Sequence, residues 1–312
     1  MTEIGFAETR HRVLGLYGDG DYAAAMQIAQ SAVIEFPDRI DQTTYWVACL
    51  HALLGRQEQA LRTLEEGFAR GLWWSPEQLE DDPDLIHLRA DDRFRALVAG
   101  SEQARASAAT ALPTEPLIRQ AEQPPARAVL VLLHGRGQMA EDVLERWTAA
   151  GQALIVAPRS TQPFGMRAVC WDDPHRAEAD VQRAVDIASS RSDVAGLPLL
   201  AAGFSQGAGL AIALAAKRRL RGVVGFIAVA PNVGLARDLI GADRRAVDGL
   251  RGHLIIGALD PRHDDCEALA EQLRGDGAEI QFEVTEGLRH DYPPAFEDRL
   301  PQLLAWALEG GG

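Results

Sequence analysis

Cysteine, positive charge and long apolar segments are all scarce in this chain of 312 residues. The three cysteines, Cys49, Cys170 and Cys266, lie far apart, with no CxxC pair and no companion histidine spacing. This pattern argues against a disulfide framework and against a structural metal site. No run of about 18 apolar residues is present to span a membrane, and the opening MTEIGFAETRHR lacks the basic-then-apolar order of a signal peptide. We therefore expect a cytoplasmic protein that needs no metal.

Acidic side chains outnumber basic ones, which gives a formal net charge of −14. Surfaces that bind nucleic acid carry clustered cations, because binding is driven by the release of counterions from the phosphates. The same charge disfavours adsorption on anionic lipid. We expect no nucleic-acid partner and no membrane insertion.

The first part of the chain has only helical periodicity, broken at GDGD (18–21), Pro37, Gly55, Gly71 and Pro83. Residues 20–26 and 55–61 superimpose at an offset of 35 residues, with Ala25 matching Ala60. A repeat near 34 residues, with small residues where paired helices touch, is the tetratricopeptide period. Residues 1–98 therefore resemble a degenerate tetratricopeptide pair, although the usual signature of the first helix is incomplete. A plain helical bundle is the alternative.

The predicted helices of this region cover residues 3–17, 21–35, 41–54 and 57–70, followed by a capping helix pair within 75–98. Residues 99–126 are rich in Ala, Ser, Pro and polar side chains and end in QPPAR, which is typical of a linker. A short first strand is expected in PLIRQAE (116–122). The domain that follows is predicted to span residues 127–312.

From Ala128 onward, short apolar runs alternate with amphipathic helical patterns. Such alternation indicates an α/β domain whose mostly parallel sheet is covered by helices on both faces. The predicted strands are 128–133, 153–158, 197–202, 223–230, 253–259 and 279–285. The predicted helices lie near 139–150, 175–191, 206–219, 264–274 and 295–308.

The pentapeptide GFSQG (203–207) stands where a strand pattern changes into a helix pattern. A tight strand-to-helix turn presents its central residue above the carboxyl ends of the strands, where ligands bind in such sheets. Glycines two residues to either side avoid collisions with the adjoining elements. We therefore predict a nucleophile elbow with Ser205 as the nucleophile. The backbone N–H of Gln206, at the helix start, is one predicted oxyanion donor.

A glycine-containing loop, LLHGRG (132–137), follows the first long apolar strand. The loop after an early strand supplies the second oxyanion donor in α/β-hydrolases, so we assign that donor to the N–H of Arg136, with Gly135 providing the turn. His134 is interpreted as a structural loop residue.

An acid and a histidine that could complete a catalytic triad also follow strands. Asp260 comes directly after the strand in IIGALD, where its carboxylate could orient a histidine. The alternatives Asp264 and Asp265 stand where a helix would start and are explained by its dipole. His290 lies in EGLRHDYPP, the loop after the last strand, from which it could reach both Ser205 and Asp260.

The order serine, aspartate, histidine is that of the α/β-hydrolases. Through LHGRG, GFSQG, GALD and GLRHDYP, residues 114–312 resemble the carboxylesterase and phospholipase family of α/β-hydrolases, which also includes thioesterase-like members. The resemblance implies a serine hydrolase of esters or thioesters that works through an acyl-enzyme and needs no cofactor. Two departures are Gln138-Met139, where the family often has an acidic residue, and Pro261-Arg262, where it often has Val-Pro.

Substrate contacts are predicted for Gly135, Phe164 and Trp171, the last two in the long segment 158–176. Core packing is an equal alternative for Trp171. Only about 20 residues separate the strands near Ala230 and His253, which is short for a lid domain and favours small or flexible substrates.

Two other functions compete with the esterase. One is a tetratricopeptide-type interaction protein with an inactive hydrolase-fold domain, which the complete serine, aspartate and histidine set disfavours. The other is a small oligopeptidase-like hydrolase, although such enzymes usually carry larger gating domains. The adjacent Trp73 and Trp74 suggest that the helical domain modulates the cleft, binds a protein partner or binds a second copy, since neighbouring residues do not share a helix face. The alternative is that one of the two packs on the hydrolase domain.

Overall fold

The computed structural model describes residues 5–191, 194–241, 247 and 249–309. The chain divides into two compact units. The helical unit comprises Met1–Ala111 and Pro163–Arg167, and the sheet unit comprises Leu112–Gln162 and Ala168–Gly312. This division falls between the predicted boundaries at residues 98 and 127, and it assigns a short segment of the second half to the helical unit.

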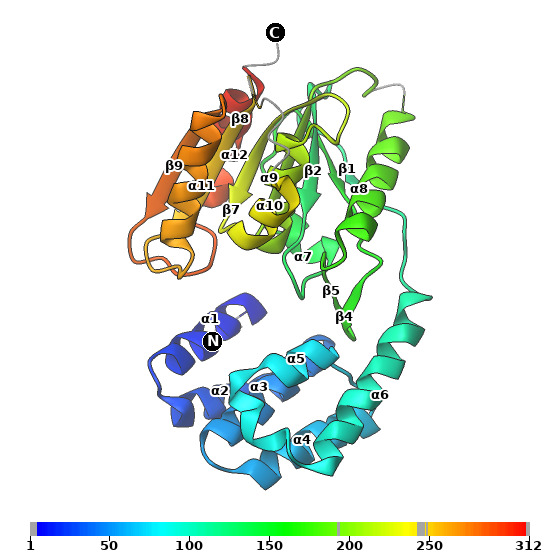
Figure 1. Ribbon diagram of the computed structural model, residues 1–312, viewed down its shortest axis with the longest axis vertical. Helices are drawn as coiled ribbons and strands as arrows, with labels where there is room; N and C mark the ends of the chain where they lie inside the picture. Colours follow the sequence, from blue (N-terminus) through cyan, green and yellow to red (C-terminus); the bar gives the residue numbers. More distant parts are fainter. Residues whose placement is uncertain (1–4, 192–193, 242–246, 248, 310–312) are drawn as a thin grey trace. The chain divides into compact units, whose positions relative to one another are not determined.

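The helical unit contains the all-helical region that the sequence predicts (Figure 1). Three of its α-helices begin at side-chain caps: Asp21 accepts a hydrogen bond from the N–H of Ala24, Ser75 from that of Gln78, and Asp91 from that of Arg93. The helices are α1 (Phe6–Gly18), α2 (Tyr22–Glu35), α3 (Ile40–Leu53), α4 (Gln57–Ala69), α5 (Pro76–Asp81) and α6 (Asp92–Ala109), with 3-10 turns at Pro37–Arg39 and Pro83–Leu88.

Helix α6 differs from the sequence prediction, which placed a linker from residue 99 onward. The helix continues to Ala109 because its last turns are rich in alanine, a strong helix former. Arg105 in this part pairs with Glu77 of α5, with a 2.7 Å distance from Nη1 to Oε1. The Ala and Ser composition that indicated a linker is therefore part of an ordered helix.

The core of the helical unit is built around α3, α4 and the turn that follows them. Trp74 is 3% exposed, and its Nε1–H donates to the carbonyl of Asp41 over 2.9 Å. Trp74 also forms an isolated bridge with Gly165 in the short strand β4 (Pro163–Gly165). Ala25 and Ala60, the small residues of the predicted repeat, have no exposed surface. The tetratricopeptide-like geometry itself stays a prediction.

In the described part of the sheet unit, seven strands form one sheet in the order β1-β3-β2-β6-β7-β8-β9. Strand β1 pairs antiparallel with β3, whereas all the other pairings are parallel. The strands are β1 (Leu117–Arg119), β2 (Ala128–Leu133), β3 (Ala153–Ala157), β6 (Leu199–Phe204), β7 (Val223–Val229), β8 (Arg251–Gly257) and β9 (Glu279–Thr285). The predicted α/β class with a mostly parallel sheet is confirmed. A short strand β5 (Ala168–Val169) lies outside this sheet.

Helices cover both faces of the sheet (Figure 1). Alternate residues of β2 face opposite layers, with Val129 and Val131 in one core and Leu130 and Leu132 in the other. The first core is closed by α8 (Pro174–Ser189), α9 (Gln206–Ala216), α10 (Val233–Ile240) and α11 (His263–Gly275), and the second by α7 (Ala140–Leu144) and α12 (Phe296–Leu308).

Two of these helices differ from the sequence prediction. Helix α7 ends at Leu144, well before the predicted residue 150. Helix α10 was not predicted, because its eight residues are too few to carry a strong periodic pattern. It begins at Asn232, whose side chain accepts a hydrogen bond from the N–H of Leu235. Among the residues that the structure describes, no helix is both long and apolar enough to cross a membrane.

Candidate active site

Ser205 occupies a sharp turn between β6 and α9. Its backbone has φ 53° and ψ −114°, a conformation that side-chain-bearing residues rarely adopt. The turn is held by its backbone: the N–H of Ser205 donates to Val229, and the carbonyl of Ser205 accepts from Gly209 and Asn232. Backbone strain of this kind gathers at functional sites. The predicted elbow conformation is therefore present at this serine.

The two glycines of GFSQG are required by close backbone approaches. A Cβ at Gly203 would lie 2.6 Å from the carbonyl oxygen of Leu133, and a Cβ at Gly207 would lie 2.4 Å from the carbonyl oxygens of Leu133 and His134. The start of α9 therefore packs directly on the end of β2 and on the loop that follows it. Only hydrogen fits at these two positions.

His290 and Asp260 lie in hydrogen-bonding order behind Ser205. His290 Nε2 is 2.9 Å from Ser205 Oγ, and His290 Nδ1 is 2.6 Å from Asp260 Oδ2. The side chain of Asp260 has no exposed surface, whereas that of His290 is 31% exposed. The three residues therefore form a continuous series of hydrogen bonds from a buried carboxylate to a hydroxyl just after the end of β6.

The loops that carry Asp260 and His290 are tied to each other. The N–H of Leu259 donates to the carbonyl of Leu288 over 2.9 Å. A Cβ at Gly257, the last residue of β8, would lie 2.2 Å from that same carbonyl oxygen, so glycine lets the histidine loop cross close to the strand end. The distance between the acid and the histidine is thus fixed by backbone packing.

Asp260 is held in its ionised form. Burial is the largest influence and by itself raises the pKa of Asp260, but the hydrogen bonds from His290 and from the backbone N–H of Arg262 outweigh it and bring the pKa below its usual value. The alternative acids have other partners. Asp264 is fully exposed and contacts His263, and Asp265 pairs with Arg237.

The loop after β2 forms a tight turn beside Ser205. The N–H of Gly135 donates to Gln138 Oε1 over 2.8 Å, and Gly137 adopts φ 79°. A Cβ at Gly135 would lie 3.4 Å from Ser205 Cβ, so this loop adjoins the elbow. Gln138 uses a side-chain oxygen that a carboxylate could equally provide, which explains why the departure from the family pattern at this position leaves the turn intact.

The candidate oxyanion donors belong to two adjoining elements. Arg136 lies in the turn between Gly135 and Gly137, and Gln206 is the first residue of α9, where backbone N–H groups have no partner within the helix. His134, just before the turn, is fully buried, and burial lowers its pKa to about 4. It is therefore neutral at physiological pH, which agrees with its interpretation as a structural residue.

The predicted substrate residues have different surroundings. Trp171 has no exposed surface, its ring stacks on that of His134, and its Nε1–H donates to the His134 carbonyl over 2.9 Å. This burial matches the core-packing alternative. Phe164 belongs to the segment grouped with the helical unit, and it is partly buried. Substrate contact by Phe164, Trp171 and Gly135 stays a prediction.

Sequence reasoning missed Asp172. Its Oδ1 accepts from Gln206 Nε2 over 2.6 Å, and its Oδ2 accepts from Arg136 Nη2 over 2.7 Å. A signal was available in WDDPHR, because a helix start needs only one capping acid. Asp173 takes that role by accepting from the N–H groups of His175 and Arg176.

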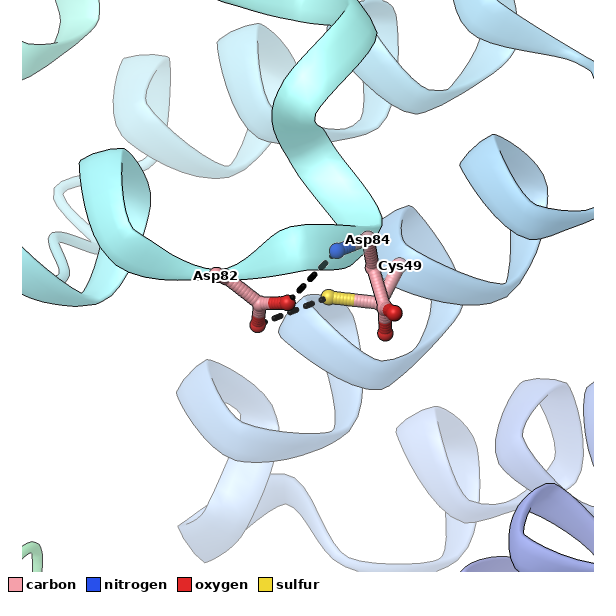
Figure 2. Close-up of side chains that lie close together, drawn as sticks. All are labelled: Cys49, Asp82 and Asp84. Atoms are coloured by element: carbon pink, nitrogen blue, oxygen red, sulfur yellow. Dashed lines mark hydrogen bonds between the residues drawn. The ribbon is translucent and has the colours of Figure 1, made fainter.

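In the described part of the helical unit, one side-chain cluster has the composition of a metal site: Cys49, Asp82 and Asp84 (Figure 2). Its donor atoms are already engaged within the protein. Asp82 Oδ2 accepts from Cys49 Sγ, and Asp82 Oδ1 accepts from the N–H of Asp84. Burial raises the pKa of the Cys49 thiol well above its usual value. This cluster is a hydrogen-bonded network that joins α3 to the end of α5 and the 3-10 turn at Pro83–Leu88.

Comparison with known proteins gives one match to a family model. Residues 9–109 match the family described as A/B hydrolase-like, N-terminal domain. No curated protein matches the chain.

Similar solved structures include an uncharacterized protein from Bacillus cereus ATCC 10987, which is 20% identical over 97% of this chain and 99% of its own, with a TM-score of 0.48. A carboxylesterase from Mesorhizobium loti is 22% identical over 61% of this chain and 93% of its own, with a TM-score of 0.48. Zea mays acyl-protein thioesterase 2 is 18% identical over 64% of this chain and 99% of its own, again with a TM-score of 0.48. These values describe likeness at low identity, and the fold is identified from the strand order given above.

The sheet unit has the α/β-hydrolase fold. It combines a mostly parallel sheet, one antiparallel edge strand, helices on both faces and an elbow after a central strand. The helical region before it matches a family model for the N-terminal domain of A/B hydrolase-like proteins.

Proposed function

We propose that this protein is a serine hydrolase that cleaves carboxylic esters or thioesters of small or flexible substrates. The observation that carries the proposal is the hydrogen-bonded chain from Asp260 through His290 to Ser205, with the serine on a strained elbow. A serine hydroxyl is a weak nucleophile unless an adjacent base takes its proton. Here the base lies at 2.9 Å and is oriented by a buried carboxylate.

The reaction begins when Ser205 Oγ attacks the substrate carbonyl carbon and its proton passes to His290 Nε2. The backbone N–H groups of Arg136 and Gln206 stabilise the oxyanion of the tetrahedral intermediate. His290 then gives its proton to the leaving alcohol or thiol, which departs and leaves an acyl-serine. In deacylation His290 takes a proton from a water molecule while the water oxygen bonds to the acyl carbon. The bond from that carbon to Ser205 Oγ then breaks, His290 returns the proton to Oγ, and the free acid leaves. Asp260 stays ionised and stabilises the imidazolium throughout.

The state of Asp260 supports a catalytic role over an inactive scaffold. A scaffold has no need for a buried Asp260 whose pKa is lowered by a histidine that also contacts a serine. Among the described residues between β7 and β8, the short helix α10 is the one regular element, which supports the separate proposal that the substrates are small or flexible. An oligopeptidase-like activity uses the same triad and becomes the second reading if peptides are cleaved faster than esters.

The proposal is tested by covalent labelling with a fluorophosphonate probe and by hydrolysis of short-chain p-nitrophenyl esters and thioesters. The wild type is expected to label and to turn over, whereas Ser205→Ala does neither. Ser190→Ala is the matched control, because Ser190 is exposed at the end of α8 and its hydroxyl donates to the nearby Ile187 carbonyl. A folded wild type that neither labels nor hydrolyses these esters refutes the proposal.

A further inference from the structure

We infer that Asp172 is a positioning residue that holds the two elements of the oxyanion hole at a fixed separation. Its carboxylate binds the side chains of the same two residues, Arg136 and Gln206, whose backbone N–H groups we assign to the oxyanion hole. This inference rests on the proposed function for its catalytic consequence, although the bridge itself can be measured separately.

The bridge divides the two oxygens of one carboxylate between two elements. Oδ1 accepts from Gln206 Nε2 over 2.6 Å at the start of α9, and Oδ2 accepts from Arg136 Nη2 over 2.7 Å in the loop after β2. Both distances are short for nitrogen and oxygen, as expected when the acceptor is charged. A lateral shift of either element would lengthen one of these bonds.

The residue next to Asp172 fastens the same two elements. The backbone N–H of Trp171 donates to Gln206 Oε1 over 2.8 Å, and its Nε1–H donates to the carbonyl of His134 over 2.9 Å. Gln206 is therefore bound at both ends of its amide, which fixes its side chain and the first turn of α9. Because the Trp171 side chain is fully buried, this attachment is anchored in the core of the sheet unit.

The need for such a bridge follows from the chemistry of the oxyanion hole. The two donors come from different segments, and their preorganisation toward the developing charge is what lowers the barrier. A catalytic constellation must be held to within about 0.5 Å by residues that surround it. The packing of Gly207 on the end of β2 brings the start of α9 close to the loop after β2. The two charge-assisted bonds of Asp172 then prevent these two elements from sliding past each other.

Asp172→Asn tests the inference with almost no change in volume. Asparagine has one acceptor oxygen, so it keeps one of the two bonds and presents an NH₂ group to the other donor. We expect kcat to fall about 10-fold to 100-fold, less than the loss of a whole oxyanion donor. KM should change less than about 3-fold, because the affected interaction belongs to the transition state. Asp238→Asn, on the exposed side of α10, is the matched control.

A conservative pair at Arg136 provides a second kinetic readout. Arg136→Lys keeps a cation beside Asp172, whereas Arg136→Met removes it while keeping an unbranched side chain. We expect the lysine variant to retain at least about 5-fold more kcat than the methionine variant. Equal losses in the two variants would contradict a role for the charged bond.

Amide hydrogen exchange measured by mass spectrometry tests the bridge without using activity. Peptides that cover residues 133–139 should exchange at least about 3-fold faster in Asp172→Asn than in the wild type and in Asp238→Asn. If exchange is unchanged and kcat stays within 2-fold of the wild type, the inference is wrong. A rise in KM with unchanged kcat and exchange would also overturn it, since Asp172 would then contact substrate. If the wild type is inactive but exchange accelerates in the variant, the proposed function fails while the bridge is upheld.

Discussion

Replacing Gly207 by alanine should disturb the proposed active site more than the same replacement at Gly203, the other glycine of the elbow. The new Cβ would lie 2.4 Å from the carbonyl oxygens of Leu133 and His134 and 2.6 Å from the carbonyl carbon of Leu133. All three are backbone atoms, so no side-chain rotation can relieve the clash. Helix α9 must move away from the loop that follows β2.

The magnitude follows from these contacts. Overpacking a well-packed site costs about 1–3 kcal/mol, and a clash with backbone on one side belongs at the upper end, about 3 kcal/mol. For a unit of about 200 residues, each kcal/mol lowers Tm by about 2–4 °C, which predicts a decrease of about 6–12 °C. The clash forces α9 and the loop that carries Arg136 apart, which separates the two proposed oxyanion donors. We therefore expect kcat to fall at least about 100-fold even below this Tm.

The measurement is thermal unfolding followed by circular dichroism, together with ester hydrolysis well below the midpoint. Gly275→Ala is the matched control, since a Cβ there meets no atom within 4 Å and the residue ends an exposed helix turn. Alanine at that position should leave Tm unchanged or raise it slightly. A Gly207→Ala variant with Tm within 2 °C of the wild type and full activity would refute the packing argument.

Two further predictions concern the buried acid and the helical core. Asp260→Asn should lower kcat/KM by about 10⁴-fold, because an amide cannot stabilise the imidazolium of His290, and unimpaired hydrolysis by a folded variant would exclude Asp260 from the site. Because the pKa of Asp260 is lower in the folded state, its contribution to stability is present above about pH 4 and is lost as the pH falls further. The free energy of unfolding, measured as a function of pH, should show this loss in the wild type and not in Asp260→Asn. Trp74→Ala should destabilise the helical unit by about 3–5 kcal/mol, because Trp74 is buried and donates to Asp41, and a denaturation midpoint equal to that of the wild type would contradict this.

The sequence predicted the strands of the sheet and the sharp turn at Ser205 because both are local signals. Continuous apolar runs such as 128–133 can be buried only between two helix layers, and Gly203 and Gly207 indicate close approaches within one turn. The order of Ser205, Asp260 and His290 along the chain led to the prediction that their three loops lie close together. Their hydrogen-bonding distances came from the structure.

Features that depend on tertiary neighbours were not accessible from the sequence. Asp172 lies 36 residues from Arg136 and 34 residues from Gln206 along the chain, so no local pattern relates them. The extension of α6 has the composition of a linker, yet Arg105 finds a partner in Glu77 only once the helices pack. Helix α10 is too short for its period to be distinguished from an ordinary loop.

Helix α9 has a consequence for how this protein responds to heat. Every residue of α9, from Gln206 to Ala216, is buried, and Ser205 is attached directly to its first turn. The predicted nucleophile therefore stands at the start of a helix that is buried along its whole length. Local fraying cannot disable the serine while the rest of the unit stays intact. The serine should consequently keep its position until the sheet unit loses its structure cooperatively, and any earlier thermal inactivation would come from the loops that carry Asp260 and His290.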